Sequence, residues 1–312
     1  MKNLKIIIFI LLIIFPFPVF ASYEHFKVWD MSDGLSNNTV KSITQDHLGF
    51  IWLGTFDGLC KFDGVDFTIF RHDLQDSLSI INNHVEVVAS VRDELWVGTK
   101  QGLNLYSYKE NNFRLCEWIL PTGERQKITE SIKNIVVNQG NVFVLTFSHE
   151  LLVRKKGCVF EPCDYKKNIE WLSISGYKEG LLIGHATDGL YVIDPDEMGI
   201  RAHFPFDSKI LSDCLYYSAN KDMIFLGFGI GYPSLAFRMN KENSLEKLEV
   251  RIPSSVKTIA DYKDETLFGT DGNGLMFFNE EGCSGISSGE SDMSSDAIYS
   301  LFVDRGQNLW IG

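Results

Sequence analysis

The 312-residue chain has few of the features that mark nucleic-acid-binding, metal-binding or disordered proteins. Only 8 residues are proline and 45% are apolar, which excludes disorder as the main state of the chain. The 29 basic residues form no dense run and are outnumbered by 41 acidic ones, so the net charge is −12. Nucleic acids and anionic membranes require a positive surface, and we expect neither as a partner. No cysteine and histidine spacing fits zinc, and we expect no metal and no cofactor.

Long apolar runs are confined to the N-terminus. Lys2 and Lys5 precede the apolar segment 6–20, and the small residue Ala21 follows it. This order is typical of a secretory signal peptide with cleavage after Ala21. An uncleaved membrane anchor is the alternative, but the segment contains two prolines and is shorter than the ~20 residues of a spanning helix. We therefore expect residues 1–21 to be removed and residues 22–312 to reach the periplasm.

The chain contains six cysteines, an even number that permits disulfides in an oxidising compartment. Cys158 and Cys163 are the only close pair, and a tight loop could join them, although the sequence does not decide whether they form a disulfide. Cys60 and Cys214 are predicted to be small residues of the core.

A repeat of about 43 residues organises the rest of the sequence. The segment 51–55, Ile-Trp-Leu-Gly-Thr, recurs at 95–99 as Leu-Trp-Val-Gly-Thr and in weaker forms further along. Seven copies are marked by Gly54, Gly98, Thr146, Gly184, Gly227, Gly269 and Gly312. This period is typical of β-propeller blades, which use four strands each. The sequence therefore predicts an all-β, seven-bladed propeller over residues 22–312.

Each copy has the pattern of a four-stranded blade. In the first copy, turns rich in Asp and Gly separate expected strands at 39–45, 50–55, 59–62 and 67–70. The third strand recurs at 102–106, 189–193 and 274–278. Gly54 is expected to lie where another backbone approaches the second strand closely.

The pattern Asp-x-x-Gly-x-x-Trp-x-Gly-Thr-x-x-Gly-Leu at residues 46–59 strongly resembles the two-component regulator propeller repeat, and residues 304–312 match it even more closely. Residues 29–40 resemble the start of the sensor region in hybrid two-component systems of gut bacteria. In that family, two seven-bladed propellers and a β-sandwich form a periplasmic sensor. A membrane helix, a histidine kinase, a receiver and a DNA-binding domain follow it.

The resemblance implies a function. Such sensors recognise an oligosaccharide released from a glycan and switch on genes for its use, and the full-length proteins are anchored in the inner membrane and expected to form homodimers. This chain would be the first propeller of a sensor, without kinase motifs and without enzymatic activity of its own. Two alternatives stay open: a secreted propeller enzyme, hydrolase or lyase, that acts on polysaccharide, and a nonfunctional fragment of a disrupted sensor gene.

The sequence stops at Gly312, inside the second strand of the seventh copy. If residues 24–29 supply the outer strand of the last blade, that blade has its first, second and fourth strands and lacks its third. About a dozen residues would complete it, from the usual lengths of a strand and a turn. We therefore expect the seventh blade to be truncated and the propeller to be incomplete at the C-terminus.

The turn after the second strand departs from the repeat in three adjacent copies. It contains His149 in the third copy, begins with His185 in the fourth and contains Tyr232 in the fifth. Local departures from a rule mark functional sites in some proteins and ordinary loop variation in others. We predict that His149, His185 and Tyr232 line part of a glycan contact, with the aromatic ring stacked on a sugar.

Two further motifs have simpler explanations. Residues 147–151, Phe-Ser-His-Glu-Leu, are similar to the phospho-accepting box of histidine kinases, but the preceding residues are β-branched and the repeat register predicts a hairpin turn. Asp57, Asp63 and Asp66 could supply the two acids of a glycoside hydrolase. Turn formation accounts for Asp57 and Asp63, and we expect no catalytic residue.

Overall fold

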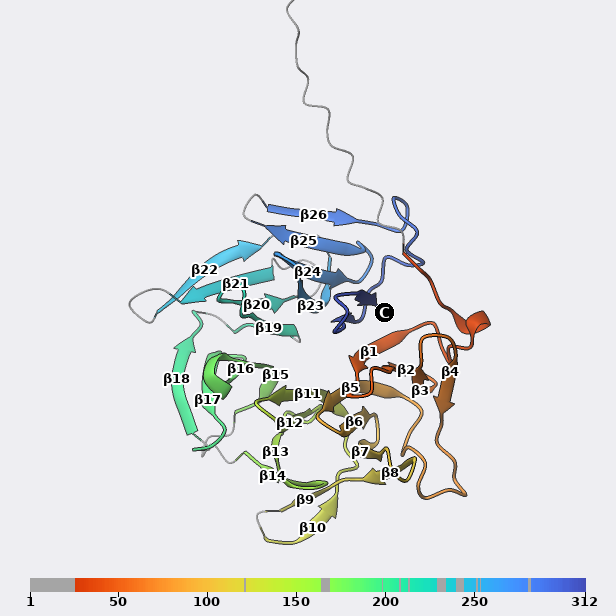
Figure 1. Cartoon of the computed structure of the whole chain (residues 1–312). Helices are drawn as coiled ribbons and strands as arrows, with labels where there is room; N and C mark the ends of the chain where they lie inside the picture. Colours follow the sequence, from red (N-terminus) through yellow and green to blue (C-terminus); the bar gives the residue numbers. More distant parts are fainter. Residues whose placement is uncertain are drawn as a thin grey trace, which may run out of the picture.

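The computed structural model describes residues 26–120, 122–163, 169–197, 199–207, 209–212, 214–228, 234–239, 244–250, 252, 254–279 and 282–312. The predicted signal peptide and its cleavage site at Ala21 lie outside these residues. Among the described residues, no helix combines the length and the apolar composition of a bilayer-spanning segment. The sheets form a ring, and the first strand of each repeat lies nearest the axis (Figure 1).

The strands follow the repeat. Blade one consists of β1 (Val40–Gln45), β2 (Ile51–Thr55), β3 (Gly58–Phe62) and β4 (Phe67–Phe70), and blade two of β5 (Val85–Val91), β6 (Glu94–Thr99), β7 (Gly102–Ser107) and β8 (Asn112–Leu115). Blade three contains β11 (Ile132–Asn138), β12 (Asn141–Thr146), β13 (Leu151–Lys156) and β14 (Val159–Pro162), and blade four β15 (Trp171–Gly176), β16 (Leu182–Ala186), β17 (Gly189–Asp194) and β18 (Gly199–Pro205). Blade five contains β19 (Cys214–Ser218), β20 (Met223–Gly227), β21 (Ser234–Met239) and β22 (Leu245–Val250), and blade six β23 (Val256–Tyr262), β24 (Glu265–Thr270), β25 (Leu275–Asn279) and β26 (Gly282–Ile286). Two short 3-10 turns are η1 (Met31–Asp33) and η2 (Lys178–Gly180).

Neighbouring strands within these blades are antiparallel and follow chain order from the axis outwards. The predicted all-β propeller is confirmed. In blade one, the predicted strands begin and end within about one residue of the observed ones. Every residue of β2 is buried, because the neighbouring blades cover both faces of the sheet.

The number of blades differs from the prediction. The described chain contains six blades of at least four strands, not seven. The last copy of the repeat forms only a two-stranded sheet of β27 (Leu301–Val303) and β28 (Leu309–Ile311). Residues 26–29 belong to the segment expected to add an outer strand there, but they are not in a strand. An outer strand needs a third strand to pair with, and the described chain has none beside β28.

The N-terminal segment instead packs on the two-stranded sheet through side chains. The rings of Trp29 and Trp310 are stacked, with their centroids 5.5 Å apart. Phe26 packs against the apolar cluster to which Leu301 and Leu309 belong. Aromatic packing thus covers an edge that backbone hydrogen bonds do not cover.

The aspartate and the tryptophan of the repeat are joined by a hydrogen bond. The Asp46 carboxylate accepts from the indole N–H of Trp52 at 2.7 Å and from the backbone N–H of Leu48 and Phe50 at 2.9 and 3.0 Å. The indole of Trp310 makes the equivalent bond, of 2.9 Å, in the last copy. The carboxylate therefore closes the turn and also satisfies the indole, a second role that the turn motif alone does not reveal.

The third blade is wider than the repeat predicts. A hairpin of β9 (Glu117–Ile119) and β10 (Arg125–Lys127) extends its outer edge, where β9 pairs in parallel with β14, and it projects from the ring in Figure 1. A disulfide joins Cys116, before β9, to Cys158, before β14. A bridge from Cys158 to Cys163 is therefore wrong, because the extended strand β14 separates these two residues by ~16 Å.

The two cysteines predicted to be core residues have different degrees of burial. Cys60 is fully buried. Cys214 is partly buried and packs against the apolar cluster of blades five and six. The prediction is thus confirmed for Cys60 and holds only partly for Cys214.

Adjacent blades are held together by contacts between a glycine and a β-branched residue. A Cβ added at Gly54 would lie 2.7 Å from Cγ1 of Val85, the first residue of the next blade's inner strand. The same arrangement joins Gly98 to Ile132, Gly227 to Val256 and Gly269 to Ile298: an added Cβ would lie 2.6 to 2.7 Å from the facing side chain. The expected close approach at Gly54 is present, but the nearest atoms belong to a side chain rather than to a backbone.

The same contact closes the ring. A Cβ at Gly312 would lie 2.7 Å from the Cβ of Val40 in β1. The Ser300 hydroxyl donates to the Val40 carbonyl at 2.9 Å, and Arg305 Nε donates to the side-chain carbonyl of Gln45 at 3.1 Å. The two-stranded sheet therefore contacts blade one directly, across 260 residues of sequence.

Blade three lacks the glycine. It has Leu145 at that position, one residue before Thr146, which the repeat spacing marks. Blade four has Trp171 at the position of Val85. The Trp171 ring lies against Gly184 of its own blade and packs with Leu145 in one apolar cluster. A bulky pair thus replaces the glycine contact, which explains why the third copy is degenerate in sequence.

We expect Gly98→Ala to destabilise the propeller, because the new Cβ would lie 2.7 Å from the side chains of both Ile132 and Val87. Overpacking of this kind lowers the free energy of unfolding by about 1–3 kcal/mol, which urea denaturation measures. Ile132→Ala should be less harmful in the Gly98→Ala protein than in the wild type, because it makes room for the methyl group. Gly289→Ala is the control, since its Cβ would meet nothing nearer than 3.9 Å. Equal losses at Gly98 and Gly289 would contradict the contact.

A non-reducing peptide map should link the peptide that contains Cys116 to the one that contains Cys158, with Cys163 outside the link. Replacing Cys116 and Cys158 by serine should lower the free energy of unfolding by about 4 kcal/mol, from the chain-entropy account of a cross-link over 42 residues. A peptide in which Cys158 is bonded to Cys163 would show that the assignment is wrong.

Candidate functional site

A buried threonine fixes the turn between the second and third strands. In blade one, the Thr55 hydroxyl donates to the Gly58 carbonyl at 2.9 Å and accepts from the Asp57 backbone N–H at 3.0 Å. Thr99 and Thr270 donate to the equivalent glycine carbonyls of blades two and six. We call the side of the ring that carries these turns the turn face; it comprises residues 56–57, 100–101, 147–150, 187–188 and 271–274.

The inner strands begin at the turn face with a β-bulge. In blade one, Val40 pairs with Thr55 and Ser42 with Gly54, so Lys41 is the extra residue. The same register shift makes extra residues of Glu86, Lys133, Leu172 and Lys257 in blades two, three, four and six. Because a bulge turns its extra side chain away from the regular pleat, these residues can be aimed at the axis. We call these five residues the bulge ring.

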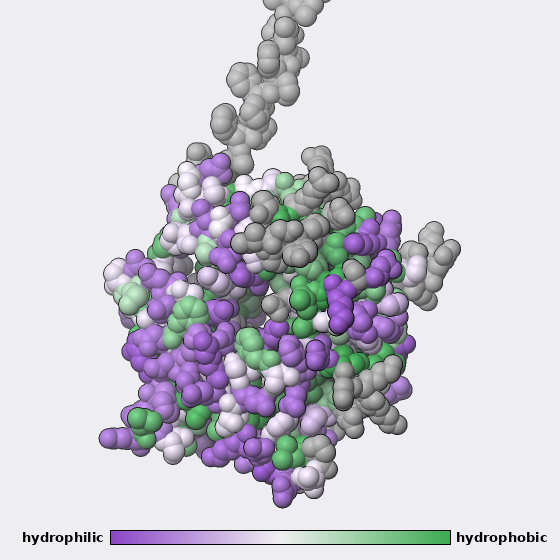
Figure 2. Space-filling view, turned by 180° about the vertical axis from the view of Figure 1, so that it is seen from behind, coloured by the Kyte–Doolittle hydropathy of each residue, from purple (hydrophilic) through white to green (hydrophobic). Residues whose placement is uncertain are grey.

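The bulge ring lines a cavity of about 300 Å³ on the axis of the propeller. The first strands of all six blades and the residues just before β27 form its wall. In the space-filling view, the surface is hollowed near the centre of the ring (Figure 2). Side chains from distant parts of the sequence thus meet around one opening, with a volume at the lower end of the range for small-molecule sites.

Charged side chains at the opening form ion pairs. Lys41 Nζ lies 3.7 Å from the Glu86 carboxylate, and His84 Nε2 lies 3.1 Å from it. Lys257 Nζ lies 3.3 Å from the carboxylate of Asp271 on the adjacent turn. Burial lowers the pKa of His84, and the negative charge of Glu86 opposes that shift only in part.

Aromatic rings lie beside these charges. Phe56 is 41% exposed and Phe147 is 49% exposed, both on the turn face. Lys41 Nζ lies 5.6 Å from the ring centre of Phe56 and 5.2 Å from that of Tyr299. Lys133 Nζ lies 5.9 Å from the ring centre of Phe147. Cation–π attraction of this kind holds partly exposed apolar rings next to the polar cavity.

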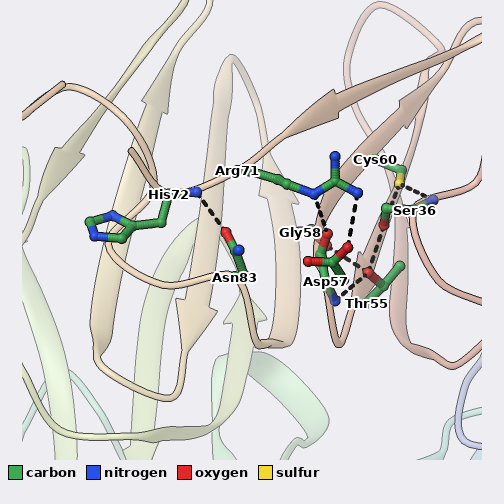
Figure 3. Close-up of polar contacts among 8 residues, drawn as sticks. All are labelled: Ser36, Thr55, Asp57, Gly58, Cys60, Arg71, His72 and Asn83. Carbon is green, nitrogen blue, oxygen red and sulfur yellow. Dashed lines mark hydrogen bonds and ion pairs between the residues drawn. The ribbon is translucent and has the colours of Figure 1, made fainter. Parts of the chain in front are cut away.

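Polar contacts fix the turn face of blade one (Figure 3). The Arg71 guanidinium donates to the Asp57 carboxylate at 2.9 Å and to the Asp57 carbonyl at 3.2 Å. The side-chain carbonyl of Asn83 accepts from the His72 backbone N–H at 2.6 Å, and its backbone carbonyl accepts from Gly58 at 2.7 Å. The loop between β4 and β5 is therefore bonded to the turn that carries Phe56.

Cys60 lies below this turn. Its thiol donates to the Ser36 hydroxyl at 3.0 Å, and Ser36 and Thr55 share a hydrogen bond of 2.8 Å (Figure 3). Burial raises the pKa of the Cys60 thiol, so it stays protonated at neutral pH. A protonated, buried thiol is a poor nucleophile, and Cys60 acts as part of the structure.

The predicted ligand residues do not share one environment. His149 is partly buried in the turn between β12 and β13, where its φ is 70° and its Nδ1 lies 2.9 Å from the Trp171 carbonyl. His185 has an exposed fraction of 0% and lies in β16, where its pairing with Leu190 matches that of Gly54 with Leu59 in blade one. Its Nδ1 lies 3.2 Å from the Ser212 carbonyl. The buried ring of His185 offers no surface to a sugar in this structure, so its predicted part in a glycan contact finds no support in its position. Tyr232 lies outside the described residues, and a glycan contact at His149 or Tyr232 stays a prediction.

The positions of the strands bear on the two other sequence motifs, the kinase-like box at 147–151 and the aspartates near β3. Residues 147–150 connect β12 to β13, which confirms a hairpin turn rather than a helical kinase box. Asp57 and Asp63 flank the two ends of β3, about 20 Å apart along an extended chain. Paired glycosidase acids need a separation of about 5–10 Å. Hydrogen bonds from the backbone N–H groups of Asp66 and Val65 lower the pKa of Asp63, as its role in a turn requires.

Sequence reasoning missed the bulge ring. A bulge is defined by how two strands pair, and single-chain spacing does not show it. One signal was present: a β-branched residue followed by a charged one opens four inner strands, at Val40-Lys41, Val85-Glu86, Ile132-Lys133 and Val256-Lys257.

The fold and the opening on its axis define the chain as a β-propeller with a candidate ligand site on the turn face. The family model "Two component regulator propeller" matches residues 34–57. Because the same motif returns at 304–312, the chain is a propeller that carries the two-component regulator repeat.

Known proteins share parts of this chain. Over 55 residues, 18% of this chain and 4% of the relative, it is 51% identical to "Histidine kinase P4" of Formosa agariphila. The extracellular domain of the hybrid two-component system BT3049 from B. thetaiotaomicron superposes with a TM-score of 0.73 at 24% identity, over 92% of this chain and 40% of that one. The extracellular domain of BT4673 from the same organism gives 0.72 at 18% identity, over 93% and 39%. These two likenesses show the fold, and the chain spans less than half of each relative.

We expect the His84 imidazole to titrate below its ordinary pKa of 6.5, because burial disfavours its charged form. Glu86→Gln should lower this pKa further, since the substitution removes the carboxylate 3.1 Å away that favours the imidazolium. Proton NMR of the histidine rings measures both effects, with His203, in blade four, as the internal control. An upward shift of His84 in the variant would contradict the arrangement.

Proposed function

We propose that this chain is the ligand-sensing propeller of a hybrid two-component regulator and that it binds an oligosaccharide at the axial opening of the turn face. The regulator repeat at residues 34–57 and the likeness to the extracellular domains of BT3049 and BT4673, both described as hybrid two-component systems, support the sensor role. The N-terminal sequence pattern and the Cys116–Cys158 disulfide favour the periplasm as its location.

The bulge ring is the observation that carries the proposed site. It brings charged donors and acceptors from four blades to one cavity. The half-exposed rings of Phe56 and Phe147 lie beside two of its lysines, Lys41 and Lys133. An oligosaccharide presents hydroxyl groups at its rim and apolar C–H groups on its faces, so it can use both kinds of surface. His149 lies in the same turn as Phe147, and we propose that it adds a polar contact.

We propose that the propeller binds its ligand without altering it. The separation of Asp57 from Asp63 and the protonated state of Cys60 support this, because neither provides an acid pair or a nucleophile. In a full-length sensor, binding would control a kinase, a receiver and a DNA-binding domain elsewhere in the chain, in a homodimer anchored in the inner membrane, and thereby genes for glycan use. The histidine kinase to which the chain is 51% identical over 55 residues supports that assignment.

Phe56→Ala and Phe147→Ala should each weaken oligosaccharide binding about fivefold or more, because each removes an apolar face beside the cavity. Isothermal titration calorimetry of the mature protein against a panel of neutral and acidic oligosaccharides measures the effect. Leu48→Ala is the matched control: Leu48 is 60% exposed but lies in the turn between β1 and β2, at the other end of the sheet.

Three results would count against this function. Binding that is unaffected by both phenylalanine substitutions would place the ligand elsewhere. Chromatographic evidence that the purified protein cleaves a glycan would favour the enzyme. The absence of binding to every oligosaccharide in the panel would contradict a sugar-sensing role.

A further inference from the structure

We propose that the ligand of the turn-face opening carries an anionic group, a carboxylate or a sulfate, and that Lys41, Lys133 and Lys257 bind it. This inference rests on the proposed function, since it specifies the chemistry of the ligand at that same site. It follows from the charge at the opening, from the geometry of the bulges and from the hydrogen-bonding capacity of the three lysines.

The charge at the opening is opposite to that of the whole chain. The sequence as a whole has a net charge of −12, yet the charged residues that line the cavity are three lysines and Glu86, which sum to +2. With the Asp271 carboxylate beside Lys257 included, the charge at the opening is +1. Positive charge gathered in a concave site focuses the local potential and attracts anions, even when the rest of the surface is acidic. The ammonium groups of Lys41 and Lys133 lie near the half-exposed rings of Phe56 and Phe147.

The geometry lets the three lysines act together. They occupy the same bulge position in blades one, three and six, so they reach the cavity from different sides of the ring. Bulges fix the direction of a side chain through the backbone, which lowers the cost of ordering a long side chain on binding. Leu172, at the same position in blade four, gives one sector of the wall an apolar surface.

The existing ion pairs leave room for a ligand. Each ammonium group has three N–H donors, and Glu86 is shared between Lys41 and His84. The Lys257 pair with Asp271 is partly exposed, at 35% and 42% for the two side chains, and such pairs contribute little on their own. At Lys41 and Lys257, a carboxylate or sulfate in the cavity can therefore accept charge-assisted bonds beside the existing ion pairs.

The test uses pairs of oligosaccharides that differ only in charge. Oligogalacturonates and alginate oligosaccharides are titrated into the mature protein beside their methyl esters, and carrageenan oligosaccharides beside their desulfated forms, so that each acidic sugar has a neutral counterpart. We expect an acidic member to bind at least tenfold more tightly than its neutral counterpart, and Lys41→Gln, Lys133→Gln and Lys257→Gln each to weaken it about tenfold. Lys209→Gln is the control, because Lys209 is exposed and does not line the cavity.

The uronate and sulfate arms of the panel distinguish the two anions. Equal or tighter binding of a neutral form would overturn the anionic ligand and leave the sensor intact. Acidic sugars that bind equally well to all three lysine variants would overturn the assignment to the bulge ring. If no oligosaccharide of either charge binds, the proposed function fails and this inference fails with it.

Discussion

The contact between a glycine of one blade and a β-branched side chain of the next is the constraint on which the ring depends. A Cβ at Gly54, Gly98, Gly227 or Gly269 would meet the facing side chain at 2.6 to 2.7 Å. Neighbouring sheets can therefore pack at their observed separation only if these positions carry no Cβ. The contact at Gly312 and Val40 has the same form and brings the last sheet against the first. Blade three, with Leu145 and Trp171, shows that a different pair of shapes can fill the same interface.

Much of the fold could be predicted from the sequence, because each copy of the repeat carries the same turn and strand signals. The strands of blade one, the hairpin at 147–150 and the all-β class follow from local turn chemistry and from the period of the marker residues. The β9–β10 hairpin and the Cys116–Cys158 bond depend on the meeting of residues 42 positions apart, about which local patterns are silent. Local patterns also fail for the outer strand expected at residues 26–29, because a strand forms there only if a neighbouring strand offers an edge to pair with.

The candidate site was predicted less well than the fold. Departures from the repeat correctly located His149 on the turn face. They also singled out His185, which departs from the repeat at a buried position where its ring bonds to Ser212 inside the protein. A departure from a repeat marks a change in the surroundings of that residue, and the change can lie in the core as well as on the ligand-binding surface. The cavity-lining lysines escaped because they obey the repeat, and only the pairing register shows where they point.

The bulges also separate two properties that are usually coupled in a sheet. An extra residue forms no pair of its own across the ladder, so its identity has little influence on the register of its blade. Lys41, Glu86 and Leu172 occupy this position in three blades with the same register shift. A propeller of this design can therefore exchange the chemistry of its axial opening one blade at a time, and new ligand preferences can arise without a cost in folding.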